Sequence, residues 1–425
     1  MPVPLRTLRV ALVLPMLLAV LAVPAPPVAA APSGPPLSVA ERELAAALGC
    51  PRSLAGVTRA PVLLVPGSFL EPRANFDWNY ERALDAAGIP WCAVTAPRYA
   101  AGDIQDTAEY VVYALRRMHE ESGRRVSVVG FSQGGMVGRW ALRWWPDTRT
   151  IVEDLIGLAP TNHGTRSGRA TCVVPCPPAG RQQLDGARFI AALNDPAETF
   201  AGIDYTVAYT RFDEVVTPNA AAATATSPLR TGDGRIRNVQ VQEICPLHVA
   251  DHLALGSYDP VGWALTIDAL THDGPADPAR IDRAVCTRVL MPGVEPAAFP
   301  VNYARYLATI ATGLLGGEQV AAEPPLRCYV TSTCAMPAAP APTSRCAGRD
   351  RVSLRLDRRL RRARVTVDGR PVRVRRRHGR LVAVIDLRRR SGVVTVRIRG
   401  VTRRGHSVSA VRRYRGCGKA AGRTP

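Results

Sequence analysis

The hydrophobic residues between positions 61 and 322 follow two alternating periods. Residues 103–123 and 135–147 repeat apolar side chains at helical spacing. Short apolar runs of strand length separate and flank these segments: PVLLVPG (61–67), WCAVTAPR (91–98), VSVVG (126–130), LIGLAP (155–160), DYTVAYT (204–210) and NVQVQEI (238–244). Strands that alternate with helices predict a mostly parallel sheet covered by helices on both faces, which is an α/β fold.

Beyond residue 345 the hydrophobic period falls to two. Segments such as RVSLRL, ARVTVDG, RLVAVIDL and VVTVRIRG alternate apolar residues with arginine, and Asp368-Gly369 is a hairpin signal. We therefore predict a small antiparallel β domain at residues 346–417, with one apolar face and one arginine-coated face. Cys346 and Cys417 bracket this domain and are expected to join its ends, since so small a core usually needs reinforcement.

Composition sets the remaining boundaries. Residues 326–345 are rich in Pro and Ala and are predicted to be a linker, in which Cys328 and Cys334 would pair locally. A disordered tail is predicted at 418–425, and the main α/β domain is predicted at 32–325.

The N-terminal residues 1–31 have the pattern of a secretory signal peptide. Arg6 and Arg9 precede an apolar run, and Val28-Ala29-Ala30 matches a cleavage site. A membrane anchor is the alternative, but the run is short and is interrupted by Pro15. We therefore expect a secreted, extracellular protein without a transmembrane segment in the mature chain. Its ten cysteines are then expected to form disulfides.

The positive charge is concentrated near the C-terminus. Residues 345–425 hold 27 Lys and Arg residues against 4 Asp and Glu residues, whereas the rest of the chain holds 28 and 31. Residues 346–417 are therefore candidates to bind an anionic surface such as lipid headgroups or a cell-wall polymer, and a charged exterior without a partner is the alternative. Nucleic acid is not the expected partner, because interleaved aromatic residues are missing.

Three glycines surround one serine in GFSQGG (130–135), where a predicted strand gives way to a predicted helix. A tight structural turn is one explanation. The context of strand, G-x-S-x-G and amphipathic helix is instead typical of a nucleophile elbow, which lifts Ser132 clear of the sheet and directs the Gln133 amide at a developing oxyanion. We therefore predict that Ser132 is a catalytic nucleophile.

A serine nucleophile at such an elbow needs an acid and then a base later in the chain. His252 and His248 both follow the last predicted strand of the main domain; His252 is the preferred base and His248 is its rival. Asp213 leaves the strand run DYTVAYT and is the predicted acid, whereas its neighbour Glu214 is expected to be solvated or structural.

The oxyanion hole needs a second donor besides the Gln133 amide. Ser68 follows the first strand run of the main domain and could offer its backbone N–H and its hydroxyl. We expect this chemistry to need no metal ion and no other cofactor.

The residues placed so far lie in stretches that resemble the lipase B family of α/β-hydrolases. Those stretches, between Cys50 and Cys328, are PVLLVPGS, DTAEYVVYAL, SQGGMVGRWAL, LAPTNHGT, RQQLDGARFIAAL, YTRFDEVVTP and CPLHVADHLAL. The resemblance implies the α/β-hydrolase fold. It also implies a catalytic and oxyanion-hole set made of Ser132, Asp213, His252, Ser68 and Gln133.

The same resemblance implies further pocket residues and disulfides. Gln183 stands where the family has a pocket glutamine, and Thr161 and Phe131 are expected to contact substrate. Thr161 departs from the acidic residue that the family often has there. The implied disulfides are Cys50–Cys92 and Cys245–Cys286, and Cys172 with Cys176 could close a small loop where a lid would lie.

These expectations indicate a serine carboxylester hydrolase of lipase type that acts on triacylglycerol or related apolar esters. A short-chain esterase or a polyester hydrolase is the alternative within the same chemistry. A non-catalytic adhesin on a hydrolase scaffold, or a protein that mainly binds surfaces through residues 346–417, is the alternative from another class. The complete set of Ser132, Asp213 and His252 disfavours the adhesin.

Overall fold

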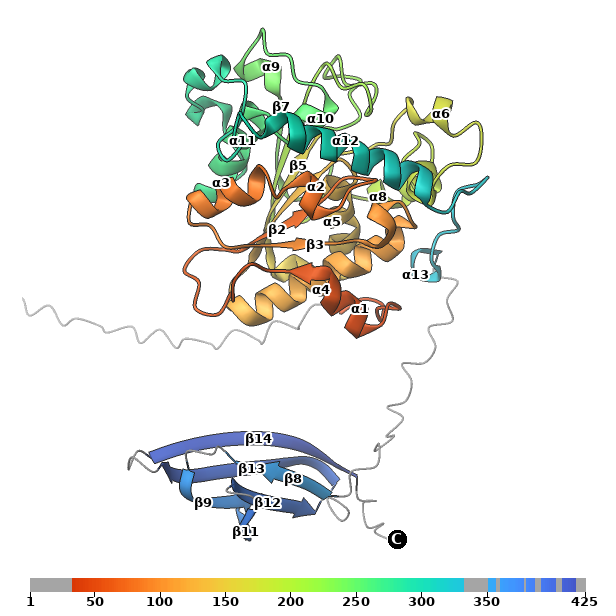
Figure 1. Cartoon of the computed structure of the whole chain (residues 1–425). Coiled ribbons are helices and arrows are strands. Elements are labelled where there is room, and N and C mark those ends of the chain that lie inside the picture. The colour runs from red at the N-terminus through yellow and green to blue at the C-terminus, as the bar shows by residue number, and fades with distance from the viewer. Residues whose placement is uncertain are drawn as a thin grey trace, which may run out of the picture. The chain divides into compact units, whose positions relative to one another are not determined.

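The computed structural model describes residues 33–331, 351–356, 360–377, 380–386, 391–402 and 407–417. The chain divides into two compact units, residues 1–333 and 334–425, which are described here separately as the main body and the β module (Figure 1). The predicted signal peptide, most of the predicted linker and the predicted tail lie outside the described residues, and so do Cys334 and Cys346.

The main body is built on a seven-stranded sheet with the order β1-β3-β2-β4-β5-β6-β7. All neighbouring strands are parallel except the short β1, which pairs antiparallel with β3. The strands are β1 (Leu48–Gly49), β2 (Val62–Val65), β3 (Trp91–Val94), β4 (Val126–Phe131), β5 (Val152–Leu158), β6 (Asp204–Tyr209) and β7 (Arg235–Gln240). The predicted parallel α/β sheet is therefore confirmed.

Successive residues of the central strands point into two different cores. In β2, Leu63 and Val65 belong to one buried cluster, and Val62 and Leu64 belong to the other. Because side chains alternate across a strand, this places one hydrophobic core on each face of the sheet. Because both faces of these strands are buried, their sequences are uninterrupted apolar runs.

Helices cover both faces of the sheet (Figure 1). Residues of α4 and α5 fill one core, and residues of α3, α11 and α12 fill the other. The helices are α1 (Glu41–Ala47), α2 (Pro72–Asn75), α3 (Tyr80–Ala86), α4 (Ile104–Ser122), α5 (Gln133–Trp144), α6 (Gly168–Thr171), α7 (Pro178–Gln182), α8 (Arg188–Asn194), α9 (Val241–Ile244), α10 (His252–Leu255), α11 (Pro260–Thr271), α12 (Phe299–Gly316) and α13 (Cys328–Thr331), with 3-10 turns at Pro97–Ala100, Pro146–Thr150, Pro278–Arg280 and Arg283–Thr287. Within the described part of the chain, none of these helices is long and apolar enough to cross a bilayer.

The predicted strand NVQVQEI is only half correct. Its first residues belong to β7, but Val241–Ile244 form the short helix α9. A capping box explains the change, because the Gln240 side chain and the Glu243 side chain each accept a hydrogen bond from the other's backbone N–H. The chain consequently turns away from the sheet immediately after β7.

Three disulfides join described cysteines of the main body. They are Cys50–Cys92, Cys172–Cys176 and Cys245–Cys286, which are the pairs that the sequence suggested. Cys328 is also disulfide-bonded.

Residues 326–331, placed at the start of the predicted linker, pack on the main body. The Tyr329 hydroxyl accepts a hydrogen bond from Trp140 Nε1 at 3.1 Å, and the Tyr329 ring lies 5.7 Å from Trp144 and 5.4 Å from Trp145. The main body therefore extends through α13, six residues beyond the predicted boundary at 325.

The β module consists of two antiparallel sheets, with the orders β10-β9-β13-β14 and β11-β12-β8. Both sheets contribute to one hydrophobic cluster, which includes Leu354, Val365, Ala383 and Val396. The strands are β8 (Arg351–Arg355), β9 (Leu360–Val367), β10 (Arg370–Val372), β11 (Val374–Arg377), β12 (Arg380–Asp386), β13 (Ser391–Thr402) and β14 (Ser407–Cys417). The predicted hairpin at Asp368-Gly369 joins β9 and β10, and the antiparallel fold class is confirmed.

We expect Tyr329→Ala to destabilise the main body by about 2–3 kcal/mol, because it removes a partly buried ring from between three tryptophans. Tyr329→Phe keeps the ring and should cost only about 1 kcal/mol for the lost hydrogen bond. Urea unfolding followed by tryptophan fluorescence measures both, since all six tryptophans lie in the main body. Equal stability of Tyr329→Ala and the unmodified chain would mean that α13 is not part of the main body.

Candidate active site

Ser132 occupies a strained corner between β4 and α5. Its backbone has φ 52° and ψ −118°, a region that residues with a Cβ rarely adopt. The corner is fixed by a hydrogen bond from the Ser132 N–H to the Leu158 carbonyl oxygen at 2.8 Å. The strand therefore ends abruptly, and the helix starts at Gln133 with amides that have no partner within the helix.

The glycines beside Ser132 allow the helix to approach the sheet. A Cβ on Gly130 would lie 2.3 Å from the backbone carbon of Gly134, and a Cβ on Gly134 would lie 2.1 Å from the Val65 carbonyl oxygen. Neither contact is possible for a real side chain. The first turn of α5 therefore packs directly on the end of β2. Because the loop that carries Ser68 follows β2, this contact brings Ser68 next to Ser132.

His252 and Asp213 form a buried pair. His252 Nδ1 lies 3.0 Å from Asp213 Oδ2, and the two side chains are 3% and 0% exposed. Asp213 Oδ1 accepts hydrogen bonds from the backbone N–H groups of Val215 at 3.0 Å and Val216 at 2.6 Å. The carboxylate is therefore held by the loop that follows β6 and faces the imidazole with its other oxygen.

Ser132 and His252 line the same cavity. The ring centroid of Phe131, the residue before Ser132, lies 4.9 Å from that of the His252 imidazole, so the two rings are in contact. No direct hydrogen bond joins Ser132 Oγ to His252 among the described residues, which is common for such pairs before substrate binds.

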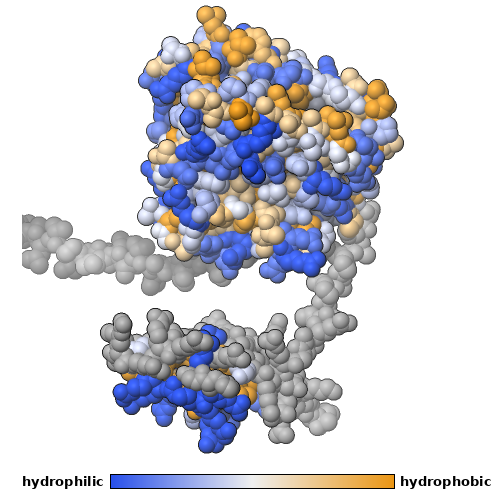
Figure 2. Space-filling view, viewed as in Figure 1, coloured by the Kyte–Doolittle hydropathy of each residue, from blue (hydrophilic) through white to orange (hydrophobic). Residues whose placement is uncertain are grey.

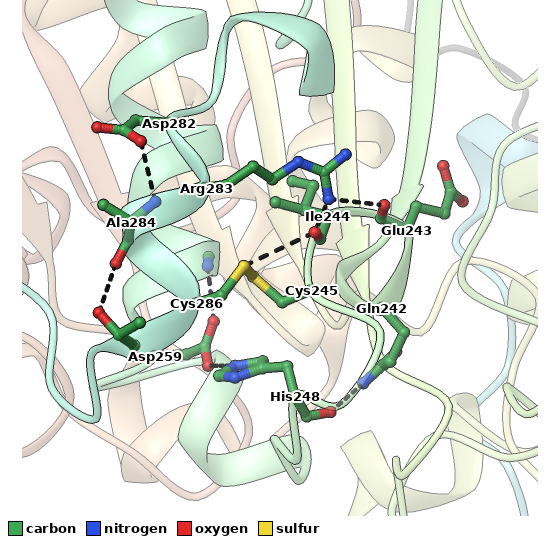
Figure 3. Close-up of a disulfide and its surroundings, with 12 residues drawn as sticks. Gln242, Glu243, Ile244, Cys245, His248, Asp259, Asp282, Arg283, Ala284 and Cys286 are labelled. Atoms are coloured by element: carbon green, nitrogen blue, oxygen red, sulfur yellow. Dashed lines mark hydrogen bonds and ion pairs between the residues drawn. A yellow bond between two sulfur atoms is a disulfide. The ribbon is translucent and has the colours of Figure 1, made fainter.

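Two other histidines contact carboxylates other than Asp213. His248 Nε2 contacts Asp259 Oδ2, next to the disulfide Cys245–Cys286 (Figure 3). His163 Nε2 lies 3.0 Å from Glu198 Oε1. His248, the predicted rival of His252 as the base, is therefore paired with a carboxylate other than Asp213. His248 lies on the loop that leads to His252.

Glu214 has a role that sequence reasoning missed. Its Oε2 accepts the backbone N–H of His252 at 3.0 Å, and its side chain lines the cavity. Burial lowers the pKa of His252, but the charge and hydrogen bond of Asp213, with the charges of Glu214 and Asp251, outweigh burial and leave this pKa above its ordinary value. No local pattern in the sequence indicates this contact, because it joins a side chain to a backbone group 38 residues away.

Asn75 is a second residue that the sequence did not single out. It is fully buried, its Oδ1 accepts the Gly67 N–H at 3.2 Å, and its Nδ2 donates to the Gly256 carbonyl oxygen at 3.1 Å. One amide side chain thereby ties the loop before Ser68 to the segment that follows α10.

The predicted oxyanion residues form a chain of hydrogen bonds. Ser68 Oγ donates to Gln133 Oε1 at 2.7 Å and accepts from Gln183 Nε2 at 2.8 Å. Gln183 Nε2 is also 3.0 Å from the Ala179 carbonyl oxygen. The hydroxyl proton of Ser68 is therefore occupied, whereas Gln133 Nε2 is buried with no partner among the described residues.

The cavity has a volume of about 670 Å³ and a mostly apolar lining. The predicted contact residues Phe131, Thr161 and Gln183 all belong to that lining. One wall comes from α12, through Ile310, Leu314 and Leu315, and another comes from the loop closed by Cys172–Cys176.

The Cys172–Cys176 loop is held in place at the mouth of the cavity. Cys176 and Val320 exchange backbone hydrogen bonds at 3.2 and 2.9 Å, which fasten the loop to the segment after α12. Within the loop, Val173 and Val174 are 82% and 61% exposed. This loop therefore places exposed apolar side chains next to the cavity.

Comparison with known proteins gives one consistent result. The chain is 31% identical over 229 residues to lipase B of Pseudozyma antarctica, an alignment that covers 52% of this chain and 65% of that protein. It therefore spans slightly less than two thirds of the relative's length. The crystal structure of Aspergillus fumigatus lipase B is similar with a TM-score of 0.64 at 33% identity, covering 71% of this chain and 74% of that one. No protein-family model matches the chain.

We expect Gly134→Ala to destabilise the main body by at least about 3 kcal/mol, since the new Cβ would collide with rigid backbone of β2. Gly138→Ala in the same helix is the matched control: its Cβ would meet only the tip of Leu155 at 3.0 Å, and alanine favours the helix, so the change should stay within about 1 kcal/mol. Urea unfolding distinguishes the two. Similar values for both substitutions would show that the close approach at Gly134 is not required.

Proposed function

Since the chain belongs to the lipase B family of α/β-hydrolases, we propose that it is a secreted serine carboxylester hydrolase that cleaves apolar esters through an acyl-enzyme on Ser132. The observation that carries the proposal is the buried His252–Asp213 pair, because its imidazole lines the same cavity as a serine held in a strained elbow. The three disulfides between described cysteines of the main body support an oxidising, extracellular destination.

Acylation follows from these positions. Ser132 Oγ attacks the ester carbonyl carbon while His252 Nε2 takes the hydroxyl proton, and Asp213 stabilises the imidazolium through Nδ1. The tetrahedral intermediate then expels the alcohol, which receives its proton from His252. Water repeats the sequence on the acyl-enzyme and releases the carboxylic acid.

The oxyanion would be held by the backbone N–H groups of Gln133 and Ser68. A half-turn of the Gln133 amide would let its orphaned Nε2 donate to Ser68 Oγ, which frees the Ser68 hydroxyl proton for the oxyanion as a third donor. Each such donor contributes about 3–4 kcal/mol to transition-state stabilisation in comparable hydrolases.

The cavity favours apolar acyl groups. Its volume lies within the usual range for ligand sites, and most of its lining surface is apolar. At its mouth Leu314 and Leu315 are 37% and 79% exposed, beside the exposed valines of the disulfide loop. Exposed apolar side chains around an entrance suit substrate that is aggregated, such as triacylglycerol, more than a freely soluble short ester.

We expect Ser132→Ala to lower kcat/KM by about 10⁴-fold or more on both emulsified triacylglycerol and a soluble short-chain ester, because no nucleophile remains to form the acyl-enzyme. Ser53→Ala, at an exposed position outside the cavity lining, is the control and should leave both rates unchanged. Retention of turnover in Ser132→Ala would exclude the proposed mechanism. A higher rate on soluble short esters than on emulsion would favour the short-chain esterase.

We expect kcat/KM to decrease at acidic pH. His252 must be neutral to accept a proton, and its raised pKa predicts that kcat/KM falls on acidification through an apparent pKa above 6.5. Glu214→Gln removes one of the charges that raise this pKa but keeps an oxygen for the His252 N–H, so the acidic limb should move to lower pH. Glu43→Gln, outside the cavity lining, should leave the limb in place. An unmoved limb in Glu214→Gln would show that Glu214 does not act on His252.

A further inference from the structure

The four-stranded sheet of the β module presents arginines on its outer face. Along β9 and β13 the buried residues alternate with exposed ones, as a half-buried strand requires. Val365, Val367, Val396 and Ile398 point into the module's core. The exposed arginines at the alternate positions are Arg362 and Arg364 on β9 and Arg397 and Arg399 on β13.

The strand register brings these charges together. Arg399 lies directly opposite Arg364, and Arg397 lies opposite Thr366. Neighbouring positions on such a face are about 5 Å apart across strands and about 7 Å apart along a strand. Like charges placed directly opposite each other destabilise a sheet, and among the described residues none of these four arginines has a carboxylate partner. The face therefore gains stability from an anion that neutralises it.

The positive charge continues around the module. Further arginines with exposed side chains are Arg361, Arg370, Arg373, Arg375, Arg376, Arg377 and Arg412. The described acidic residues of the module are Asp368 and Asp386, and Asp368 Oδ1 already accepts the Thr395 N–H at 2.7 Å. In Figure 2 the described atoms of the module form a mostly hydrophilic surface. Among the module residues whose side-chain exposure is described, Val384 is the large apolar residue that is strongly exposed, at 52%.

We propose that the outer face formed by Arg362, Arg364, Arg397 and Arg399 binds a linear polyanion that carries closely spaced phosphate groups. Guanidinium groups bind phosphate oxygens bidentately, and a row of them at 5–7 Å intervals matches a chain that presents one anionic group after another. The interaction releases condensed counterions, so its affinity depends strongly on salt.

The distribution of the arginines favours a polymer over a membrane. A flat bilayer can meet only one face of a small domain, whereas the exposed arginines lie on both sheets and a flexible chain can follow them. Among the residues of the four-stranded sheet whose side chains are described, none that is exposed is a large apolar or aromatic residue that could enter an acyl layer or stack on bases. For a secreted hydrolase, such a contact would retain the enzyme on phosphate-rich extracellular material and raise its local concentration there.

The test measures binding of the full chain to fluorescently labelled long-chain inorganic polyphosphate by anisotropy at several salt concentrations. Replacing Arg362, Arg364, Arg397 and Arg399 with Gln should weaken binding at least about tenfold near 0.15 M salt and lower the slope of log affinity against log salt by about three. The matched control replaces four exposed arginines of the main body, Arg42, Arg73, Arg237 and Arg288, with Gln and should leave the slope unchanged.

Two further variants keep the test decisive if the fourfold variant does not fold. Arg364→Gln and Arg399→Gln each remove one charge of the opposed pair, and each should lower the slope by about 0.7–0.9. Loss of salt-dependent binding in the control variant, or unchanged slopes in the module variants, would overturn the proposal. So would binding to vesicles of phosphatidylglycerol and phosphatidylcholine in equal parts without binding to polyphosphate. Because binding is measured without turnover, the result is independent of the proposed hydrolase activity.

Discussion

The contact between the first turn of α5 and the end of β2 is the constraint on which the candidate site depends. Gly130 and Gly134 have no side chains, so the helix can begin within contact distance of the Val65 carbonyl oxygen. The turn between strand and helix must then be short, and this forces Ser132 into a backbone conformation that a residue with a Cβ adopts only under strain. The strain is balanced by burial of the apolar face of α5 and of the two central strands. Ser132 consequently lies in the lining of the cavity.

The other half of the site depends on two loops that leave the sheet after β6 and β7. The first carries Asp213 and Glu214, and both reach His252: one contacts the imidazole, the other contacts the backbone N–H. The second loop is fixed before it reaches His252 by Cys245–Cys286 and by the His248–Asp259 pair (Figure 3). His252 is therefore held in three ways. Asp213 contacts its imidazole, Glu214 accepts its backbone N–H, and the disulfide and the His248–Asp259 pair fix the chain that leads to it. We regard this rigidity as the reason why one histidine among several is suited to act as the base.

The sequence predicted most of the scaffold because the scaffold is periodic. Apolar runs are uninterrupted where both faces of a strand are buried, so the central strands could be predicted. The long helices α4 and α5 could be predicted because their apolar residues repeat at helical spacing. The prediction was wrong where polar contacts between neighbouring residues outweigh the hydrophobic pattern. The capping box between Gln240 and Glu243 ends the last strand of the main body earlier than the pattern predicts. Composition also misled at residues 326–331, where a proline-rich context hid Tyr329, which packs against Trp140.

The contacts at the site divide in the same way. Ser132 was singled out because its elbow is a local motif, and Asp213 with His252 because each follows a strand in the expected order. Glu214 and Asn75 were not found, because each contacts backbone groups far away in the sequence and neither contact leaves a local pattern. The arginine pair on β9 and β13 is of the same kind, since only the strand register shows that Arg364 and Arg399 are opposite each other.

The central claim is that Ser132 is activated by His252 and Asp213 in a cavity for apolar acyl groups. The most direct measurement is mass spectrometry of the full chain after reaction with an alkyl phosphonate ester, which phosphonylates activated serines and releases its alcohol. We expect one adduct per chain, located on the peptide that contains Ser132, and we expect no adduct when His252 is replaced by Ala. An adduct on another residue, or undiminished labelling of the His252→Ala variant, would contradict the proposed catalytic centre.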